Sequence, residues 1–316
     1  MSLFGTDGVR GVAGVDLTAD LARSLAAAAV AELVEVHQST PLVVVGRDPR
    51  PSGSWLKEAV VDGLKSAGAD VALLGVIPTP AVARAVADGV PGRSTKPSFG
   101  IVISASHNPV QDNGIKLFGA GGVKLDDATE QRIEARIGTT HESSRRGVVV
   151  ADLVGQPAWY VDALIETLPD RLGGLRLVVD CANGAAGPIA ADAYTRAGAA
   201  VTVINADPTG AHINDGCGAT HLEALQAAVV EMGADMGIAH DGDADRCLAV
   251  GGDGAVVGAG DIGEDVRLLH FGRKPLAYEN VVDAPADVPF PGMAEVAPPC
   301  VETVPFMEFT EGIHET

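Results

Sequence analysis

Phe99-Gly-Ile-Val-Ile-Ser104 runs directly into Ala105-Ser-His-Asn-Pro109. The first run is apolar, as in a strand buried on both faces, and the second has the composition of a tight turn. The same order occurs upstream, where the apolar run Leu42–Gly46 leads into Arg47 and Asp48. Helical, Ala-rich segments separate such runs, so the pattern predicts an α/β protein. Open sheets of this class bind ligands at the carboxyl ends of their strands, where these polar turns follow.

The alternation predicts two α/β units joined by a linker, which we place around Arg145 and Arg146. In the first unit, predicted strands are 42–46, 71–75 and 99–104, and predicted helices are 18–36 (capped by Thr18), 54–67 and 127–137. A further Ala/Val-rich helix follows the break that Pro78 and Pro80 should impose. In the second unit, predicted strands are 175–180, 201–203 and 236–239, and predicted helices are 187–197 and 221–232.

The predicted domains are residues 1–145 and 155–258, and residues 259–316 form a predicted tail. Between positions 275 and 316 there is no Lys or Arg, but there are eight acidic residues and seven of the chain's 19 prolines. Neither a helical nor a strand period persists there. The composition favours an irregular acidic segment over a third α/β domain.

Composition and charge narrow the class of partner. The chain has 316 residues, 47% of them hydrophobic but only 4% aromatic, so its core must consist of Ala, Val, Leu and Ile. A formal net charge of -20 argues against binding to nucleic acid or to an anionic membrane surface. The most apolar stretch, 24–34, is too short to span a bilayer. Four cysteines without C-x-x-C spacing, and no secretory signal pattern, favour a cytoplasmic protein with reduced thiols.

Asp241-Gly-Asp-Ala-Asp-Arg246 carries three carboxylates within five residues. They repel one another unless a cation neutralises them, and apolar runs on both sides place the loop at a strand end. Oxygen ligands at alternate positions suit Mg²⁺, which keeps coordination places for water and a phosphate oxygen. The loop is not an EF-hand, because Arg246 and Gly252 stand where that motif needs Gly and Glu. A solvated acidic turn is the alternative interpretation.

Ser106 lies in the turn after the strand at 99–104, where its hydroxyl is presented outward. The adjacent His107 can bind a phosphate oxygen, and Asn108 suits the turn. Alone, this stretch would be an ordinary turn; together with the Asp cluster, it predicts that Ser106 carries a phosphoryl group. A Ser-His-Asp hydrolase is disfavoured, because the chain has no G-x-S-x-G elbow and a base adjacent in sequence rarely has the required geometry.

A phosphorylated ligand requires cationic partners, and the candidates are Arg10, Arg47, Lys116 and Arg246. Arg10 lies in the Gly-rich segment 4–11, whose backbone N–H groups could approach a phosphate. Lys116 follows the serine loop and could act as an acid or base or as a phosphate contact. Any one of the four alone would more often be a surface charge. The chain has no Walker A motif, so ATP use is not indicated.

These motifs together resemble the α-D-phosphohexomutase superfamily, and most closely its bacterial phosphoglucosamine mutase branch. The resemblance follows the family's motif order over about the first 260 residues. The matching segments are 4–11 (Phe-Gly-Thr-Asp-Gly-Val-Arg-Gly), 46–48 (Gly-Arg-Asp), 103–109, 112–116 (Asp-Asn-Gly-Ile-Lys), 214–221 (Asn-Asp-Gly-Cys-Gly-Ala-Thr-His) and 241–246. The forms of the serine loop and of segment 214–221 favour the glucosamine branch over the phosphomannomutase branch.

The resemblance implies two tandem α/β domains with mixed sheets, followed here by the irregular acidic tail. It implies interconversion of glucosamine 6-phosphate and glucosamine 1-phosphate through a phosphoserine and a bisphosphorylated intermediate. The residues with implied catalytic roles are Ser106, His107, Lys116 and Arg246. Arg10 and Arg47 would bind the phosphorylated ligand. The implied ligands of Mg²⁺ are Ser106 (through its phosphate), Asp241, Asp243 and Asp245.

Other family members have a third domain with a sugar-contacting loop and a fourth with a phosphate clamp, and neither motif occurs in this sequence. We interpret this as the absence of domains III and IV, which a truncated or frameshifted gene would explain. Three interpretations therefore stay open: a mutase, a non-catalytic phosphosugar-binding remnant, and a Mg²⁺-dependent phosphatase-like activity in which water discharges Ser106. A homodimer stays open as well.

Overall fold

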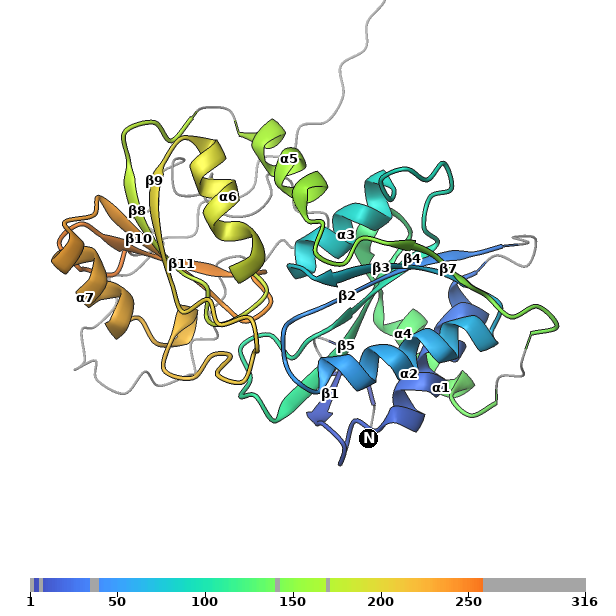
Figure 1. Ribbon diagram of the computed structural model, residues 1–316. Helices are drawn as coiled ribbons and strands as arrows, with labels where there is room; N and C mark the ends of the chain where they lie inside the picture. Colours follow the sequence, from blue (N-terminus) through green and yellow to red (C-terminus); the bar gives the residue numbers. More distant parts are fainter. Residues whose placement is uncertain (1–2, 6–7, 35–39, 140–142, 169–170, 258–316) are drawn as a thin grey trace, which may run out of the picture. The chain divides into compact units, whose positions relative to one another are not determined.

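The computed structural model describes residues 3–5, 8–34, 40–139, 143–168 and 171–257, and the predicted tail at 259–316 lies outside them. Two separate β-sheets are found in this part of the chain (Figure 1), and both belong to one compact unit. Each sheet mixes parallel and antiparallel pairs and is accompanied by helices. The predicted α/β class with mixed sheets is therefore confirmed.

The first sheet has the strand order β1-β5-β4-β2-β3-β7, with β6 paired to β5. Its strands are β1 (Val9–Val12), β2 (Leu42–Arg47), β3 (Asp70–Val76), β4 (Phe99–Ile103), β5 (Asp112–Gly119), β6 (Val123–Lys124) and β7 (Val149–Asp152). Strands β4, β2, β3 and β7 run parallel, whereas β5 pairs antiparallel with β4, β1 and β6. β7 pairs with β3 just beyond Arg145 and Arg146, so the predicted linker leads into an edge strand of the first sheet.

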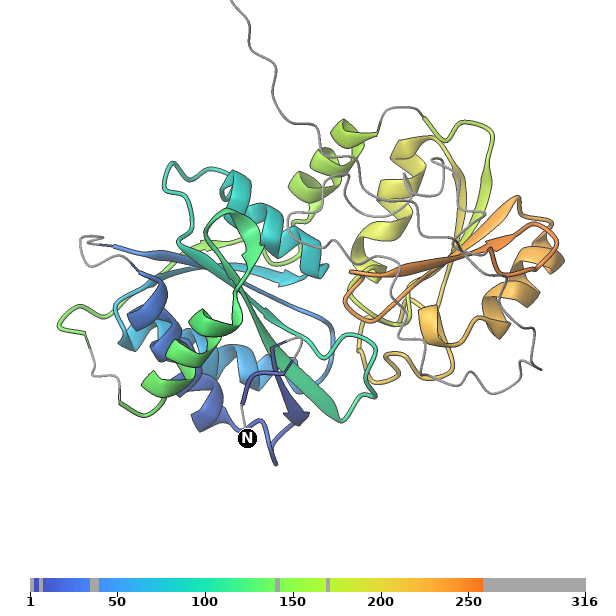
Figure 2. The same cartoon turned by 180° about the vertical axis from the view of Figure 1, so that it is seen from behind.

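Helices cover both faces of the first sheet (Figures 1 and 2). Helices α1 (Ala19–Leu33), α2 (Gly53–Ser66) and α4 (Asp127–Arg136) lie on one face, and α3 (Thr79–Asp88) lies on the other. Successive residues of β2 show the effect: Val43 and Val45 are buried with α1 and α2, whereas Val44 is buried with α3. Side chains alternate across a strand, so burial on both faces explains why these strands read as unbroken apolar runs.

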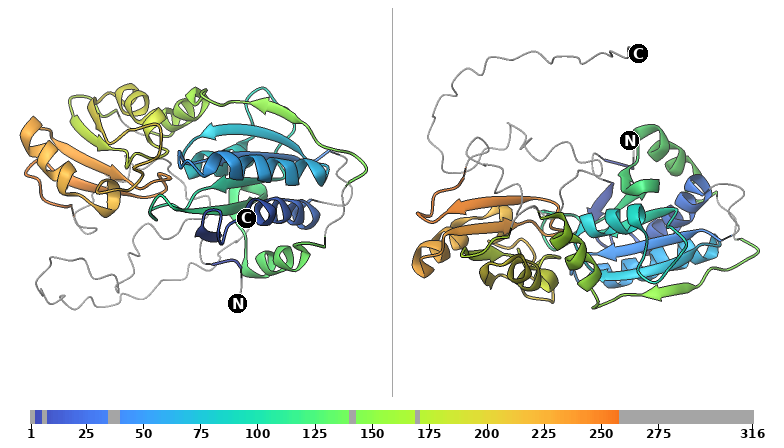
Figure 3. Two further views of the ribbon diagram at one scale, coloured as in Figure 1. Left: turned by 60° about the horizontal axis from the view of Figure 1, so that its bottom comes forward. Right: turned by 90° about the horizontal axis from the view of Figure 1, so that it is seen from above.

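The second sheet has the strand order β11-β10-β8-β9. Its elements are β8 (Arg176–Asp180), α6 (Gly187–Ala197), β9 (Ala200–Ile204), the 3₁₀ turn η2 (Gly218–Thr220), α7 (Glu223–Met232), β10 (Met236–His240) and β11 (Cys247–Gly251). α6 is buried against one face and α7 against the other (Figure 3). Helix α5 (Ala158–Thr167) contacts α6, and its Tyr160 and Val161 belong to the same apolar cluster as α3 and α6.

The predicted end of α1 was wrong. α1 ends at Leu33, because Val34 is already extended, while positions 35 and 36 lie outside the described residues. Pro78 lies in a chain break before a helix, as predicted, because β3 ends at Val76 and α3 starts at Thr79; Pro80 lies not in the break but in the first turn of α3. Proline is tolerated there because the first N–H groups of a helix have no partner within the helix. As a result, Thr79 stands at the helix start with its backbone N–H available to another segment.

The predicted cap of α1 is confirmed, and it allows a stability prediction. The Thr18 hydroxyl accepts a hydrogen bond of 3.2 Å from the backbone N–H of Leu21. Replacing Thr18 with Ala removes this acceptor and should lower the free energy of unfolding by about 1 kcal/mol. Urea denaturation monitored by circular dichroism measures the change. Thr18→Ser keeps the acceptor and should stay close to wild type; an equal loss in both variants would contradict a capping role.

In the described part of the chain, none of the helices has both the length and the apolar character needed to cross a bilayer.

Candidate functional site

Two loops that are far apart in the sequence meet at the carboxyl ends of β4 and β10. The hydroxyl of Ser106, in the loop after β4, donates a hydrogen bond of 2.5 Å to Oδ2 of Asp241, the first residue after β10. Both residues are buried, with exposed fractions of 0% and 1%. The close approach depends on Gly242, because a Cβ atom there would lie 2.5 Å from the carbonyl oxygen of Ser106. The serine and acidic motifs therefore form one site.

Ser106 has a positive φ of 53°, a conformation that non-glycine residues adopt at a free-energy cost of about 1–3 kcal/mol. Three hydrogen bonds hold its backbone in place. The N–H of Ser106 donates to the Ser104 hydroxyl at 2.9 Å, and its carbonyl oxygen accepts from Arg50 and from Asn214, each at 2.9 Å. The strained backbone is thus fixed from both sides, and the direction of the hydroxyl with it.

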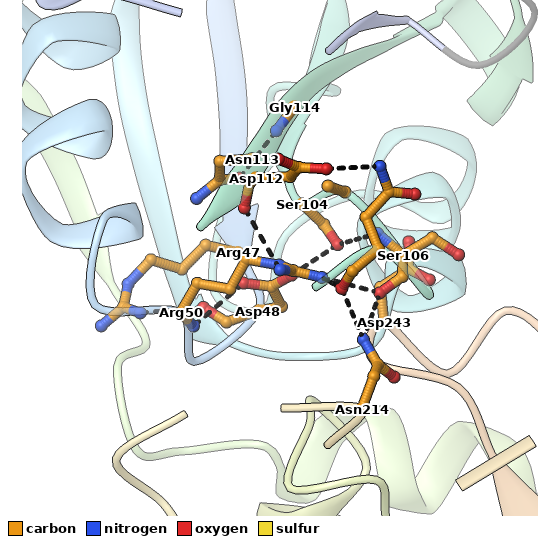
Figure 4. A network of polar contacts seen from close by, with 12 residues as sticks. Arg47, Asp48, Arg50, Ser104, Ser106, Asp112, Asn113, Gly114, Asn214 and Asp243 are labelled. Atoms are coloured by element: carbon orange, nitrogen blue, oxygen red, sulfur yellow. Dashed lines mark hydrogen bonds and ion pairs between the residues drawn. The ribbon is translucent and has the colours of Figure 1, made fainter. Parts of the chain in front are cut away.

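Arg50 is the centre of this network (Figure 4). Its side chain is completely buried and pairs with the equally buried Asp48 at 2.9 Å. The guanidinium also donates to backbone carbonyl groups of the serine loop, namely those of Ser106 (2.9 Å), Asn108 (2.7 Å), Pro109 and Asp112 (3.2 Å). Asp48 additionally accepts a bond of 2.6 Å from Ser104, which itself accepts from Ser106. One buried ion pair therefore sets the shape of the whole loop.

The three aspartates form a compact acidic group. Asp241, Asp243 and Asp245 each offer a carboxylate oxygen, and these oxygens lie within 4.8 Å of one another. Lys116 on β5 approaches Oδ2 of Asp243 at 2.9 Å and Oδ2 of Asp245 at 3.4 Å. Burial opposes ionisation of Asp243, but the ammonium of Lys116 outweighs it and lowers the pKa of Asp243. For Asp241, burial and the negative charges of Asp245 and Asp243 raise the pKa well above its ordinary value.

The group fits a hard divalent cation. When all three carboxylates are ionised, the single buried ammonium of Lys116 leaves an excess of two negative charges. Oδ1 of Asp243 is buried and has no hydrogen-bond partner among the described residues. Buried polar atoms are normally paired, so an orphaned carboxylate oxygen beside two further carboxylates indicates a place for a metal ion. The alternative of a solvated acidic turn does not agree with this burial.

The other predicted site residues lie around this centre with different exposure. The His107 side chain reaches the surface, but neighbouring groups remove part of its hydration. This partial desolvation and the positive charges of Arg246 and Arg10 lower the pKa of His107, which favours the neutral imidazole. The side chain of Arg246 is 59% exposed and lies 3.7 Å from Asp245. Arg10 on β1 donates to the Ala105 carbonyl at 3.2 Å and to the Asn108 side chain at 3.1 Å.

Arg47 stands apart from this group. Its guanidinium donates to the carbonyl of Asp48 at 2.8 Å, and its aliphatic part packs against Gly53 at the start of α2. The structure thus brings Ser106, Lys116 and the three aspartates into direct contact, and it places His107, Arg10 and Arg246 beside them. Among the described residues, Arg47 forms no hydrogen bond or ion pair with Asp241, Asp243 or Asp245.

Sequence reasoning missed three residues that build the site. Arg50 resembles a surface charge in the sequence, although its place between Pro49 and Pro51 after a strand end was a signal of a fixed turn. Asn214 was part of a recognised motif, but the motif did not show that its amide binds the carbonyls of Ser106 and Asn108. Thr79, which donates to Asp243 at 2.6 Å, followed a proline and resembled an ordinary helix start.

Comparisons with known proteins agree with the fold and the site. Sequence models of the phosphoglucomutase/phosphomannomutase α/β/α domains I and II match residues 1–144 and 158–254. The chain is 53% identical to the phosphoglucosamine mutase of Frankia casuarinae over 89% of its own length and 62% of that protein. It is 54% identical to the phosphoglucosamine mutase of Salinispora arenicola over 80% of its length and 56% of that protein. The chain therefore spans about three fifths of the relatives that it matches.

A solved structure shows the same fold. A phosphoglucomutase/phosphomannomutase family protein of Burkholderia thailandensis superposes with a TM-score of 0.70 at 31% identity, covering 81% of this chain and 56% of that one. Fold and site together define a two-domain α/β protein with a buried serine against a loop of three carboxylates. The chain belongs to the phosphoglucomutase/phosphomannomutase family. Members of this family use metal ions, and the acidic group is the matching feature here.

Proposed function

We propose that this chain carries the phosphoserine and metal half of a phosphoglucosamine mutase. Its substrate would be glucosamine 6-phosphate, a small phosphorylated hexosamine, and its product glucosamine 1-phosphate. The observation that carries the proposal is the 2.5 Å contact between the Ser106 hydroxyl and Asp241 within a buried group of three aspartates. The high identity to phosphoglucosamine mutases supports this choice of sugar.

The reaction consists of two phosphoryl transfers in opposite directions. Phosphorylated Ser106 gives its phosphoryl group to the C1 hydroxyl of the 6-phosphate, so that the bond from serine oxygen to phosphorus breaks and a bisphosphate forms. The proton of the C1 hydroxyl passes to the serine oxygen, which becomes the Ser106 hydroxyl. After the bisphosphate has turned round, the Ser106 oxygen bonds to the phosphorus on the sugar's O6 and the bond from O6 to phosphorus breaks. The proton of the Ser106 hydroxyl passes to O6. Atoms and charge balance without any co-reactant.

Residues of this chain have defined proposed tasks in these steps. Lys116, held at 2.9 Å from Asp243, is proposed to move the proton or to contact the phosphoryl group. The exposed side chains of His107 and Arg246 would bind oxygens of the incoming phosphate. Arg10 and Arg47 remain proposed phosphate ligands; Arg10 also holds the serine loop through Ala105.

The proposed metal is Mg²⁺, because three carboxylates leave places for water and phosphate oxygens. Asp241, Asp243, Asp245 and the phosphate on Ser106 would hold it. When bound, it would supply positive charge against the charge that develops on the transferring phosphoryl group. The proposed partner is a small phosphosugar and the proposed location is cytoplasmic. The net charge of -20 argues against nucleic acid or an anionic membrane surface as the partner.

The test is a phosphorylation and turnover assay on the purified chain with Mg²⁺ and glucosamine 1,6-bisphosphate. We expect phosphate on Ser106, detected by mass spectrometry, and interconversion of the two monophosphates. Phospho-Ser106 without turnover would instead support a phosphosugar-binding remnant, and steady phosphate release would support a phosphatase. Absence of any phosphate on Ser106 would overturn both the mutase and the phosphatase interpretations.

Replacing Asp243 with Asn tests the proposed metal site separately from the phosphorylation of Ser106. The substitution keeps size and shape but removes a charge from the acidic group, so Mg²⁺ affinity should fall by about tenfold or more. Isothermal titration with Mg²⁺ alone measures this directly. Unchanged affinity would count against the metal loop, whatever the phosphorylation assay gives.

A further inference from the structure

Thr79 contacts the metal loop from the first sheet's side of the site. Its hydroxyl donates a hydrogen bond of 2.6 Å to Oδ2 of Asp243, and its backbone N–H donates one of 2.9 Å to the carbonyl oxygen of the same residue. Thr79 is completely buried. As the first residue of α3, it is held in place by a helix whose apolar face packs into the core. Its hydroxyl is therefore a fixed donor aimed at one oxygen of one aspartate.

The two oxygens of Asp243 have unequal surroundings. Oδ2 accepts from Thr79 at 2.6 Å and from Lys116 at 2.9 Å, whereas the buried Oδ1 has no hydrogen-bond partner among the described residues. Two donors on one oxygen fix the rotation of the carboxylate plane. The remaining oxygen, Oδ1, is then held in a single orientation, and Asp243 belongs to the group whose carboxylate oxygens lie within 4.8 Å of one another.

We infer that Thr79 is a positioning residue for the metal: its hydroxyl occupies Oδ2 of Asp243 and so reserves Oδ1 for the cation. The inference rests on the metal loop of the proposed function. It also explains why Thr79 and not Lys116 alone holds the carboxylate. Lys116 is shared with Asp245 at 3.4 Å and has a proposed task in the reaction, so it is a poor permanent anchor. Partners of metal ligands typically change metal affinity by about 10–100-fold when they are removed.

The chemistry of the two common hard cations gives a specific readout. Mg²⁺ requires near-ideal octahedral geometry, whereas Ca²⁺ accepts variable numbers and directions of oxygen ligands. A carboxylate that is free to rotate should therefore impair Mg²⁺ binding more than Ca²⁺ binding. A purely structural role of Thr79, as a link between α3 and the acidic loop, would lower the stability of the metal-free protein without changing this preference.

The experiment compares Thr79→Val, Thr79→Ala and Thr79→Ser in the full chain by isothermal titration with MgCl₂ and CaCl₂. The phosphate state of Ser106 is fixed beforehand and verified by mass spectrometry. Val and Ala remove the hydroxyl but keep the backbone N–H bond, and Ser keeps both. We expect Mg²⁺ affinity to fall about tenfold or more in Val and Ala, with a smaller fall for Ca²⁺, and to stay near wild type in Ser.

Two results would overturn the inference. One is Mg²⁺ affinity within twofold of wild type in a folded Thr79→Val or Thr79→Ala variant. The other is an equal loss of Mg²⁺ and Ca²⁺ affinity in these variants, together with a lowered melting temperature of the metal-free protein. Lack of Mg²⁺ binding by the wild-type chain would overturn the metal loop itself and the role of Thr79 with it. If the Thr79→Val variant does not fold, the Thr79→Ala variant, which has a smaller side chain and also lacks the hydroxyl, still allows the measurement.

Discussion

Replacing Arg50 with Met is expected to lower the free energy of unfolding by about 3–5 kcal/mol. The reason is that Arg50 and Asp48 are both fully buried, so the substitution leaves a carboxylate without its counter-ion in a site that water does not reach. Burial already raises the pKa of Asp48, and the charge of Arg50 is the strongest influence that opposes this rise. Backbone carbonyls of the serine loop also lose their donor.

Urea denaturation of the wild type and Arg50→Met measures this loss. Asp48→Asn in the same background provides the matched control, because it removes the unpaired charge and keeps a side chain that can bond Ser104. The double variant should therefore recover part of the stability lost in the single one. An Arg50→Met protein within about 1 kcal/mol of wild type would show that the pair is dispensable for the fold.

Strands β2, β3, β4, β8, β9 and β10 could be predicted from the sequence, because helices cover both faces of each sheet. Strands buried on two sides need continuous apolar runs, and 42–46, 71–75, 99–104 and 236–239 all became strands. Strands β1, β5, β6, β7 and β11 were not predicted, and β7 shows one reason. Its residues are partly exposed at the edge of the first sheet, and only pairing with β3 makes Val149–Asp152 a strand. Edge strands lack the double burial that produces the signal.

The ionisable residues of the site were predicted, whereas most of its neutral supports and its buried arginine were not. The Asp cluster could be recognised in the sequence because three carboxylates at alternate positions repel one another unless a cation neutralises them. Thr79, Asn214 and Arg50 act through contacts with residues from 56 to 164 positions away, and local sequence carries no trace of such partners. Local sequence patterns predict the secondary structure and the burial of a segment. Which distant donor meets an oxygen is decided by the packing of two sheets.

Replacing Ser106 with Ala is expected to abolish phosphate incorporation while the fold persists. The substitution removes one oxygen and keeps the Cβ atom, so the positive φ of 53° and the bonds of the carbonyl to Arg50 and Asn214 remain available. Loss of the hydrogen bond from the Ser106 hydroxyl to Asp241 should lower the free energy of unfolding by about 1 kcal/mol. Phosphate incorporation should fall below detection, because the transferred group then has no oxygen to bond to.

Ser104→Ala is the matched control for this prediction. Ser104 is an equally buried serine two residues earlier, but its hydroxyl is already bonded to Asp48 at 2.6 Å and to the N–H of Ser106. Its loss should loosen the loop and slow phosphorylation, yet the phosphate should still map to Ser106. Peptide mapping after reaction with the bisphosphate separates the two variants. Phosphate on Ser104 or His107 of the Ser106→Ala protein, at the extent seen in wild type, would show that the 2.5 Å contact with Asp241 does not mark the acceptor oxygen.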